Sequence, residues 1–218
     1  MSRLCVILAG GEIHGETLQI PEDAYLICAD RGLLAAEAMG RTPDYIVGDF
    51  DSLGYMPGYP DAVFYPAQKD DTDTMLAVRH ACAMQFQTVE IYGGLGGRLD
   101  HTLANIQTLQ YLAQQGVTGT LISECNRVTL QMGGSVRQYP KREGWYFSLL
   151  SFSEQCTGVC ASGVEYSLHN HVLTNGFPLG VSNHILAPQA VISLKEGSLL
   201  VIESRDSEPN SCHGNIMG

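Results

Sequence analysis

The first half of the chain alternates short apolar runs with segments in which apolar residues recur every three or four positions. The short runs are rich in β-branched and aromatic residues and predict strands over 4–9, 25–29, 45–47, 62–65, 89–92 and 120–122. Helical periodicity between them predicts a short helix over 33–39, a longer one with Met75, Val78, Cys82 and Phe86 on one face, and a third with Leu99, Leu103, Ile106, Leu109 and Ala113 on one side. Because strands that alternate with helices form a parallel sheet covered by helices, we predict a three-layer α/β/α unit.

The second half has a different pattern. After about residue 126 the helical periodicity ends, and β-prone runs recur between turn residues over 128–132, 145–152, 164–168, 190–194 and 199–203. The segment Lys195-Glu196-Gly197-Ser198 is predicted as the turn of a hairpin between the last two runs. We therefore divide the chain into an α/β domain over 1–125, an all-β domain over 126–212 and a tail over 213–218.

Composition narrows the possible partners. The formal net charge is -11, from 23 acidic and 12 basic residues, so the chain lacks the positive field that binding to nucleic acid would need. An acidic protein that binds a polyanion needs compensating charge, and a divalent cation held by carboxylates is the usual source. No apolar run approaches a membrane span, the start of the chain lacks the features of a signal peptide, and seven scattered cysteines are expected to be reduced thiols of a cytoplasmic protein.

A first acidic pair follows the apolar run at 45–47. The segment Gly48-Asp49-Phe50-Asp51-Ser52 lies where a strand leaves the carboxyl edge of the sheet, which is where ligands sit in open α/β folds. Asp49 and Asp51 point to the same side of an extended backbone, and a bound cation is the simplest reason for the pairing. The alternative is a solvated turn capped by an aspartate.

A second acidic set directly precedes the helix that begins near residue 75. In Lys69-Asp70-Asp71-Thr72-Asp73-Thr74, Asp70 and Asp73 stand three apart at a helix start, where the helix dipole favours anions. Capping alone would explain Thr72 or one aspartate, but not three carboxylates. Lys69 beside them offers a contact to phosphate.

A glycine-rich segment joins the strand over 89–92 to the third helix. It reads Gly93-Gly94-Leu95-Gly96-Gly97-Arg98-Leu99-Asp100-His101, and its glycines allow backbone N–H groups to approach an anion at a helix start. Its spacing fits neither the dinucleotide fingerprint nor the P-loop, and a structural turn is the alternative. The charged residues that follow at once favour a binding site. Gly10-Gly11 and Asp30-Arg31-Gly32 are predicted at the same edge.

Taken together, these motifs resemble those of the thiamine pyrophosphokinase family, and the bacterial branch in length. The resemblance covers nearly the whole chain and implies an α/β nucleotide-binding, catalytic domain followed by a β-sandwich that binds thiamine and forms a homodimer. The matching segments, in chain order, are Cys28-Ala29-Asp30-Arg31-Gly32, the run from Gly48 to Ser52, Asp70-x-Thr72-Asp73, the glycine segment through His101 with Asn105 behind it, and Gly180-Val181-Ser182-Asn183.

The resemblance also implies a reaction and roles. ATP would donate its two terminal phosphates as one pyrophosphoryl group to the hydroxyl of thiamine, with Mg²⁺, releasing AMP. The four aspartates Asp49, Asp51, Asp70 and Asp73 would hold Mg²⁺ and the polyphosphate, and either Asp49 or Asp73 would orient or deprotonate the hydroxyl. The implied ATP and phosphate contacts are Asp30, Lys69, Thr72, Gly94, Gly96, Gly97 and Arg98; the implied thiamine contacts are Asp100, Ser182 and Asn183, the last two from the second copy of the dimer.

One departure concerns the wall of the thiamine pocket. Some family members stack the substrate on an aromatic residue downstream of the Ser-Asn pair, whereas here His184-Ile185-Leu186 follows. The single tryptophan, Trp145, lies upstream. The resemblance therefore assigns no stacking residue.

Three other interpretations compete. A haloacid-dehalogenase-like phosphohydrolase uses an Asp-x-Asp after a strand, but it expects Thr or Val where Leu53 stands, and it leaves the glycine segment unexplained. A non-catalytic sensor would bind thiamine diphosphate or a nucleotide without turnover. A zinc module could use Cys156, Cys160, His169 and His171, although their spacing matches no common finger.

Overall fold

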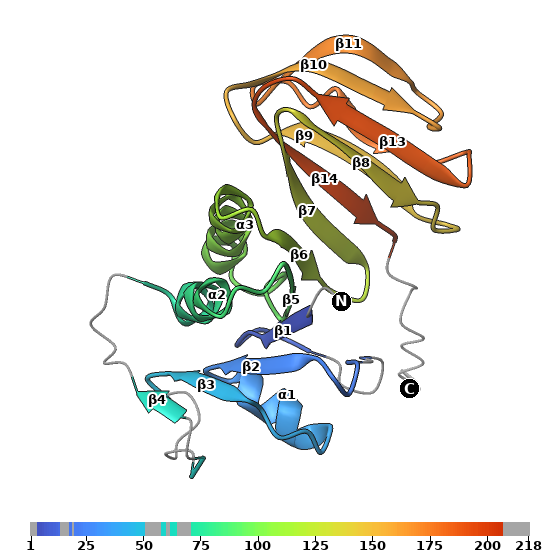
Figure 1. The fold of residues 1–218 in the computed structure, drawn as a ribbon. Coiled ribbons are helices and arrows are strands. Elements are labelled where there is room, and N and C mark those ends of the chain that lie inside the picture. The colour runs from blue at the N-terminus through green and yellow to red at the C-terminus, as the bar shows by residue number, and fades with distance from the viewer. Residues whose placement is uncertain are drawn as a thin grey trace, which may run out of the picture.

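The structure is a computed structural model that describes residues 4–13, 18, 20–50, 58–59, 62–64 and 71–206 (Figure 1). The predicted site residues Asp51, Lys69 and Asp70 lie outside this part of the chain, as does the tail predicted over 213–218. No helix among the described residues is long and apolar enough to cross a membrane.

The elements of the described part follow the predicted change from α/β to all-β. In chain order they are β1 (Leu4–Leu8), β2 (Tyr25–Ala29), α1 (Gly32–Ala38), β3 (Tyr45–Gly48), β4 (Ala62–Phe64), α2 (Asp73–Ala83), β5 (Thr88–Tyr92), α3 (Leu99–Gln114), β6 (Thr118–Ile122), β7 (Asn126–Met132), β8 (Ser135–Pro140), β9 (Tyr146–Ser151), β10 (Gln155–Ser162), β11 (Leu168–Thr174), β12 (Gly180–Asn183), β13 (Gln189–Leu194) and β14 (Ser198–Ser204).

The first half forms three layers, as predicted. Strands β1 to β6 pair in parallel in the order β6-β5-β1-β2-β3-β4, with α1 on one face and α2 and α3 on the other (Figure 1). Alternate residues of β1 serve the two faces: Leu8 packs in the core with Leu33 of α1, and Ile7 packs with Val78 of α2 and Leu109 of α3. Both faces of the sheet are covered, which explains why β1 is apolar throughout.

The second half is a sandwich that shares its sheet with the first. Strand β7 pairs antiparallel with β6, so one ten-stranded sheet runs in the order β12-β9-β14-β7-β6-β5-β1-β2-β3-β4. A four-stranded sheet, β11-β10-β13-β8, packs against it through a core that includes Phe147 and Leu199 on one side and Val159 and Ile192 on the other. The predicted α/β unit followed by a β-sandwich is confirmed.

Two local predictions in the second half are wrong. The strand expected over 164–168 is a connection between β10 and β11; Gly163 adopts a left-handed φ of 76°, and Val164 makes only an isolated bridge to Ile185. The expected hairpin at 195–198 joins strands of different sheets, because β13 belongs to the four-stranded sheet and β14 to the ten-stranded one. This turn carries the chain across the sandwich.

The apolar side of α3 is only partly covered. Leu109 is buried, whereas Leu99 and Leu103 near the helix start are 71% and 54% exposed. The C-terminal end agrees with expectation, since Gly116 follows the helix with a left-handed φ of 74°.

The direction of the strand order changes at β1. The chain proceeds from β1 outward to β4 and then returns to place β5 on the other side of β1, so the loops after β1 and β5 diverge at a topological switch point. The two loops touch through their backbones: the N–H of Gly11 donates to the carbonyl of Gly93 at 3.1 Å. A Cβ atom on Gly11 would lie 2.2 Å from that oxygen, so this contact requires glycine.

We predict that Gly11→Ala lowers the free energy of unfolding by about 1–3 kcal/mol, because the added methyl group forces the two loops apart. The neighbouring Gly10→Ala is the matched control, since its Cβ would meet nothing closer than 3.6 Å, and it should change stability by no more than about 0.5 kcal/mol. Urea unfolding of both variants measures the difference. Equal stability of the two variants would contradict the close contact.

Candidate functional site

Two of the predicted carboxylates lie at the carboxyl ends of neighbouring strands. Asp30 follows β2 and Asp49 follows β3; the strands pair in parallel, and the N–H of Asp30 donates to the carbonyl of Val47 at 2.9 Å. A Cβ on Gly48 would lie 3.2 Å from the Asp30 backbone, so glycine lets the two strand ends pass closely. Asp30 and Phe50 both adopt left-handed φ values, 49° and 59°. The structure thus brings Asp30 and Asp49, both half-buried, to one edge.

The start of α2 contributes the third described carboxylate. Asp73 is the first residue of the helix and is half-buried. Thr72 is the N-cap, and its hydroxyl accepts a hydrogen bond from the N–H of Met75 at 3.2 Å. Asp71 forms an ion pair with Arg79 at 3.3 Å. Because α2 follows the parallel strand β4, it begins at the same carboxyl edge as Asp30 and Asp49.

Asp30, Asp49 and Asp73 offer carboxylate oxygens, the type of ligand that Mg²⁺ prefers. Within the described ranges no three His, Cys, Asp or Glu side chains converge into a complete metal cage. Mg²⁺ rarely uses such a cage: one or two carboxylates and the phosphates of a substrate commonly hold it. The zinc interpretation is wrong for the same reason, because Cys156, Cys160, His169 and His171 all lie in the described part of the chain and form no such group.

Two side chains of α3 hold the glycine segment through hydrogen bonds to its carbonyl groups. The buried side chain of Asn105 donates to the carbonyl of Gly94 at 2.8 Å, and the hydroxyl of Thr102 donates to that of Gly96 at 3.1 Å. Gly96 and Gly97 adopt left-handed φ values of 89° and 64°. The loop is therefore fixed in a conformation that side chains rarely allow, which gives Asn105 of the sequence motif a structural role.

Arg98 and Asp100 pair with each other at the start of α3. Two hydrogen bonds join them, from Nη2 to Oδ2 at 2.6 Å and from Nε to Oδ1 at 3.1 Å, and the N–H of His101 also donates to Asp100 at 2.9 Å. The bond from Arg98 lowers the pKa of Asp100, so the carboxylate stays charged. Both side chains are exposed, so a ligand that binds one of them also contacts the other.

The Ser-Asn pair lies at the far end of the ten-stranded sheet. Asn183 is buried, and its amide donates to the carbonyl of Tyr166 and accepts from the Tyr166 N–H, both at 3.0 Å. Ser182 is exposed with a left-handed φ of 60°. From β12 to β3 there are eight strand spacings, roughly 38 Å along the sheet at about 4.8 Å each. Within one chain, Ser182 and Asp49 do not form a single site.

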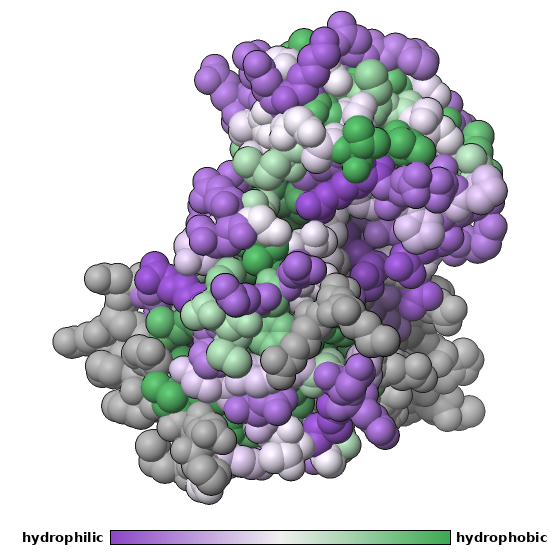
Figure 2. Space-filling view, in the orientation of Figure 1, coloured by the Kyte–Doolittle hydropathy of each residue, from purple (hydrophilic) through white to green (hydrophobic). Residues whose placement is uncertain are grey.

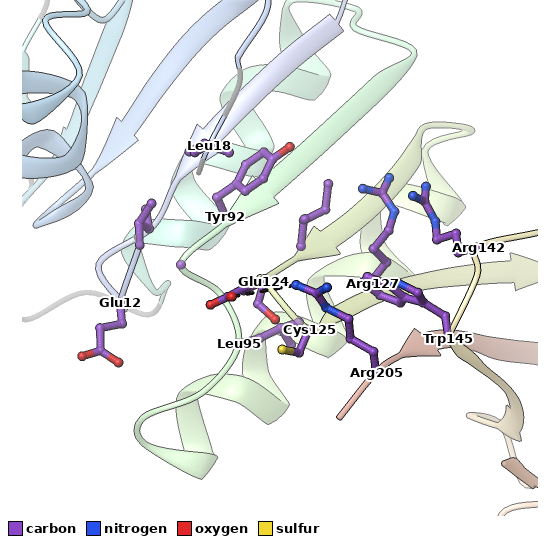
Figure 3. A pocket seen from close by; sticks show the side chains of 14 residues that line it. Glu12, Leu18, Tyr92, Leu95, Glu124, Cys125, Arg127, Arg142, Trp145 and Arg205 are labelled. Carbon is purple, nitrogen blue, oxygen red and sulfur yellow. Dashed lines mark ion pairs between the residues drawn. The ribbon is translucent and has the colours of Figure 1, made fainter. Parts of the chain in front are cut away.

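A pocket of about 530 Å³ opens beside the glycine segment, between the two halves of the chain. Three arginines gather around Trp145 on one side of it, whereas Glu12 lies apart from them (Figure 3). Sequence analysis missed this pocket, and the single tryptophan was its only signal. The lining residues are Glu12, Ile13, Leu18, Tyr92, Gly93, Leu95, Ile122, Ser123, Glu124, Cys125, Arg127, Arg142, Trp145 and Arg205.

Comparisons with known proteins agree over both halves of the chain. Residues 18–121 match the model of the thiamin pyrophosphokinase catalytic domain, and residues 135–199 match that of the thiamin pyrophosphokinase vitamin B1 binding domain. The chain is 31% identical over 209 residues to the thiamine pyrophosphokinase of Bacillus subtilis, covering 92% of this chain and 98% of that protein.

Solved structures give the same result. A crystal structure of thiamine pyrophosphokinase from Bacillus subtilis superimposes with a TM-score of 0.86 at 29% identity, covering 94% of this chain and all of that one. The enzyme of the same name from Geobacillus thermodenitrificans reaches 0.82 at 27% identity, covering 94% and 99%. With two family models and a full-length relative in agreement, the chain belongs to the thiamine pyrophosphokinase family.

Proposed function

We propose that this protein transfers a pyrophosphoryl group from ATP to the hydroxyl of thiamine, giving thiamine diphosphate and AMP. The observation that carries the proposal is the match of both halves of the chain to thiamin pyrophosphokinase. It is supported by Asp30, Asp49 and α2, which all follow parallel strands and so leave the sheet at its carboxyl edge. Family membership also disfavours the haloacid-dehalogenase alternative.

The acidic edge would hold Mg²⁺ with the polyphosphate. Asp49 and Asp73 would supply two of the carboxylates that bind the cation. We assign Asp51 and Asp70, which lie outside the described residues, to the same role. Mg²⁺ would offset the charge of the triphosphate in a chain whose own net charge is -11. Asp49 or Asp73 would take the proton of the thiamine hydroxyl.

Positioning of the phosphates falls to the remaining groups. We assign backbone N–H groups of Gly94, Gly96 and Gly97 to them, because α3 already fixes that loop. Phosphoryl transfer asks little covalent chemistry of a protein, so fixed placement of this kind is most of the work. The other assigned ATP and phosphate contacts are Asp30, Lys69, Thr72 and Arg98.

We further propose a homodimer in which each active site uses both copies. Asp100 would bind thiamine from the α/β half, but Ser182 lies about eight strands from the acidic edge of its own chain. Ser182 of one copy would therefore serve the other, while Asn183 fixes the backbone beside it. Phe177, 66% exposed, precedes β12, and Figure 2 shows further exposed hydrophobic residues over the four-stranded sheet. Exposed apolar surface of this kind favours a protein interface.

The proposed location is the cytoplasm. The six cysteines in the described part of the chain are free thiols, whereas an oxidising compartment would favour disulfides. Burial raises the pKa of Cys5 and of Cys28 to about 12, so both stay protonated and unreactive in the folded chain.

Asp73→Asn tests the acidic edge. Loss of the carboxylate removes a cation ligand, so AMP release that depends on both thiamine and Mg²⁺ should fall by about 100-fold or more. Asp71→Asn is the matched control, since that carboxylate pairs with Arg79, and its rate should stay near that of the unmodified protein. Retained turnover in Asp73→Asn would reject its assigned role. Binding of thiamine and ATP without AMP release would instead identify a non-catalytic sensor.

Mixed dimers test the shared site. Asp49→Asn and Ser182→Asn should each be inactive or nearly so, and asparagine suits the left-handed backbone at position 182. Unfolding and refolding the two variants together should restore about a quarter of the normal activity, because half of the dimers are mixed and each has one intact site. Recovery of no activity, with mixed dimers present by mass spectrometry, would show that each site belongs to one chain.

A further inference from the structure

The pocket beside Trp145 shares a wall with the glycine segment. Gly93 and Leu95 line it, and the carbonyl of Gly93 contacts the N–H of Gly11. The adjacent Gly10 lies against the carboxylate of Asp30, since a Cβ there would be 3.6 Å from Oδ2. The described residues Gly10 and Gly11 therefore lie between the wall of this pocket and Asp30. The volume of about 530 Å³ suits a small molecule.

Three guanidinium groups lie around the tryptophan, each paired with a glutamate. The guanidinium carbons of Arg142 and Arg205 lie 5.8 and 5.6 Å from the centre of the Trp145 ring, and Arg127 lies in the same group (Figure 3). The whole chain has only 12 lysines and arginines. These guanidinium groups offer flat faces and N–H donors beside an indole ring, so the pocket suits a planar ring that carries hydrogen-bond acceptors.

Carboxylates fix the arginines without using all their donors. Buried Glu203 accepts from Nε of Arg142 at 2.9 Å and lies 4.0 Å from Nε of Arg127. Glu124 lies 3.8 Å from Nη2 of Arg205. A guanidinium group carries five N–H donors, so these contacts orient the arginines and leave donors for a ligand.

We infer that this pocket receives the adenine and ribose of the donor nucleotide. The base stacks on Trp145 or on the guanidinium planes beside it, and the phosphates run past the glycine segment toward the acidic edge. Guanidinium planes and aromatic rings are the surfaces on which nucleobases stack. The inference rests on the proposed use of ATP and assigns Trp145 to the nucleotide, not to thiamine.

The single tryptophan gives a direct test. In the full-length protein, titration with AMP should produce a saturable change in tryptophan emission, and titration with pyrophosphate or thiamine should not. Calorimetry on the same samples measures binding independently. Saturable AMP binding without any change in emission would overturn the site, as would a saturable response to thiamine alone.

Failure of this inference differs from failure of the proposed function. An active protein whose AMP binding leaves Trp145 emission unchanged would retain the function and lose the site. A protein without thiamine-dependent AMP release, but with a Trp145 response to AMP, would lose the function and keep the site.

Kinetics provide a second test that does not depend on fluorescence. Trp145→Leu should raise KM for ATP by about 10- to 100-fold, the usual effect of losing one stacked base, with kcat and KM for thiamine unchanged. Trp145→Phe keeps a ring and should recover most of the affinity. A fall in kcat without a change in KM for ATP, or an equal rise in both KM values, would overturn the assignment.

A charge variant covers the case in which Trp145→Leu does not fold. Arg205→Gln removes a guanidinium group that is partly exposed and should also raise KM for ATP alone. Lys141→Gln is its control, because Lys141 pairs with Glu143 at 2.9 Å and does not line the pocket. Equal kinetics for these two variants would count against the site.

Discussion

The contact between Gly11 and Gly93 is the constraint on which the arrangement depends. Parallel strands deliver their loops to one edge, and the change of strand order at β1 makes two of those loops diverge. They diverge from a point of backbone contact, where a hydrogen bond of 3.1 Å joins them and no Cβ fits. Asp30 and Asp49 lie on one side of this point, and the pocket with Trp145 lies on the other.

This arrangement separates a group of carboxylates from a group of arginines within a chain that is acidic overall. Carboxylates at the ends of β2, β3 and the start of α2 favour a cation. Arginines from the second half surround the pocket, each oriented by a glutamate. A nucleotide polyphosphate can use both environments, a metal ion for its phosphates and a flat surface for its base, and Gly10 and Gly11 lie between them.

The hydrophobic pattern predicted most strands and helices of the first half, because their burial can be read from their own residues. Strands β1 and β2 are nearly continuous apolar runs because helices cover both faces, whereas β5 alternates buried and half-buried residues. Thr72 caps the start of α2, as the sequence predicted. The sandwich was harder, because half of each strand faces solvent and the partner decides its role. The turn at 195–198 has the residues of a hairpin, yet no local signal tells whether the next strand stays in the same sheet.

The same distinction separates the site residues that the sequence could locate from the features that it missed. Asp30, Asp49 and Asp73 follow strands or begin a helix, so topology alone places them at one edge. The motif implied a thiamine contact for Asn183, but it gave no sign that the amide bonds to Tyr166, a residue 17 positions away. The pocket joins loops near residues 93 and 123 to Arg142 and Arg205, and only the pairing of β6 with β7 brings them together.

That pairing also decides how independent the two halves are. Along β14, Leu199 and Val201 face the sandwich core, whereas Leu200 packs with Leu130 in the core that α2 and α3 cover. Removing residues after 125 would expose that face of the first half and leave β6 as an unpaired edge. The boundary that the end of helical periodicity places near residue 126 therefore divides functions more than it divides folding units. The arginines of the second half can act at a pocket of the first because one sheet fixes both.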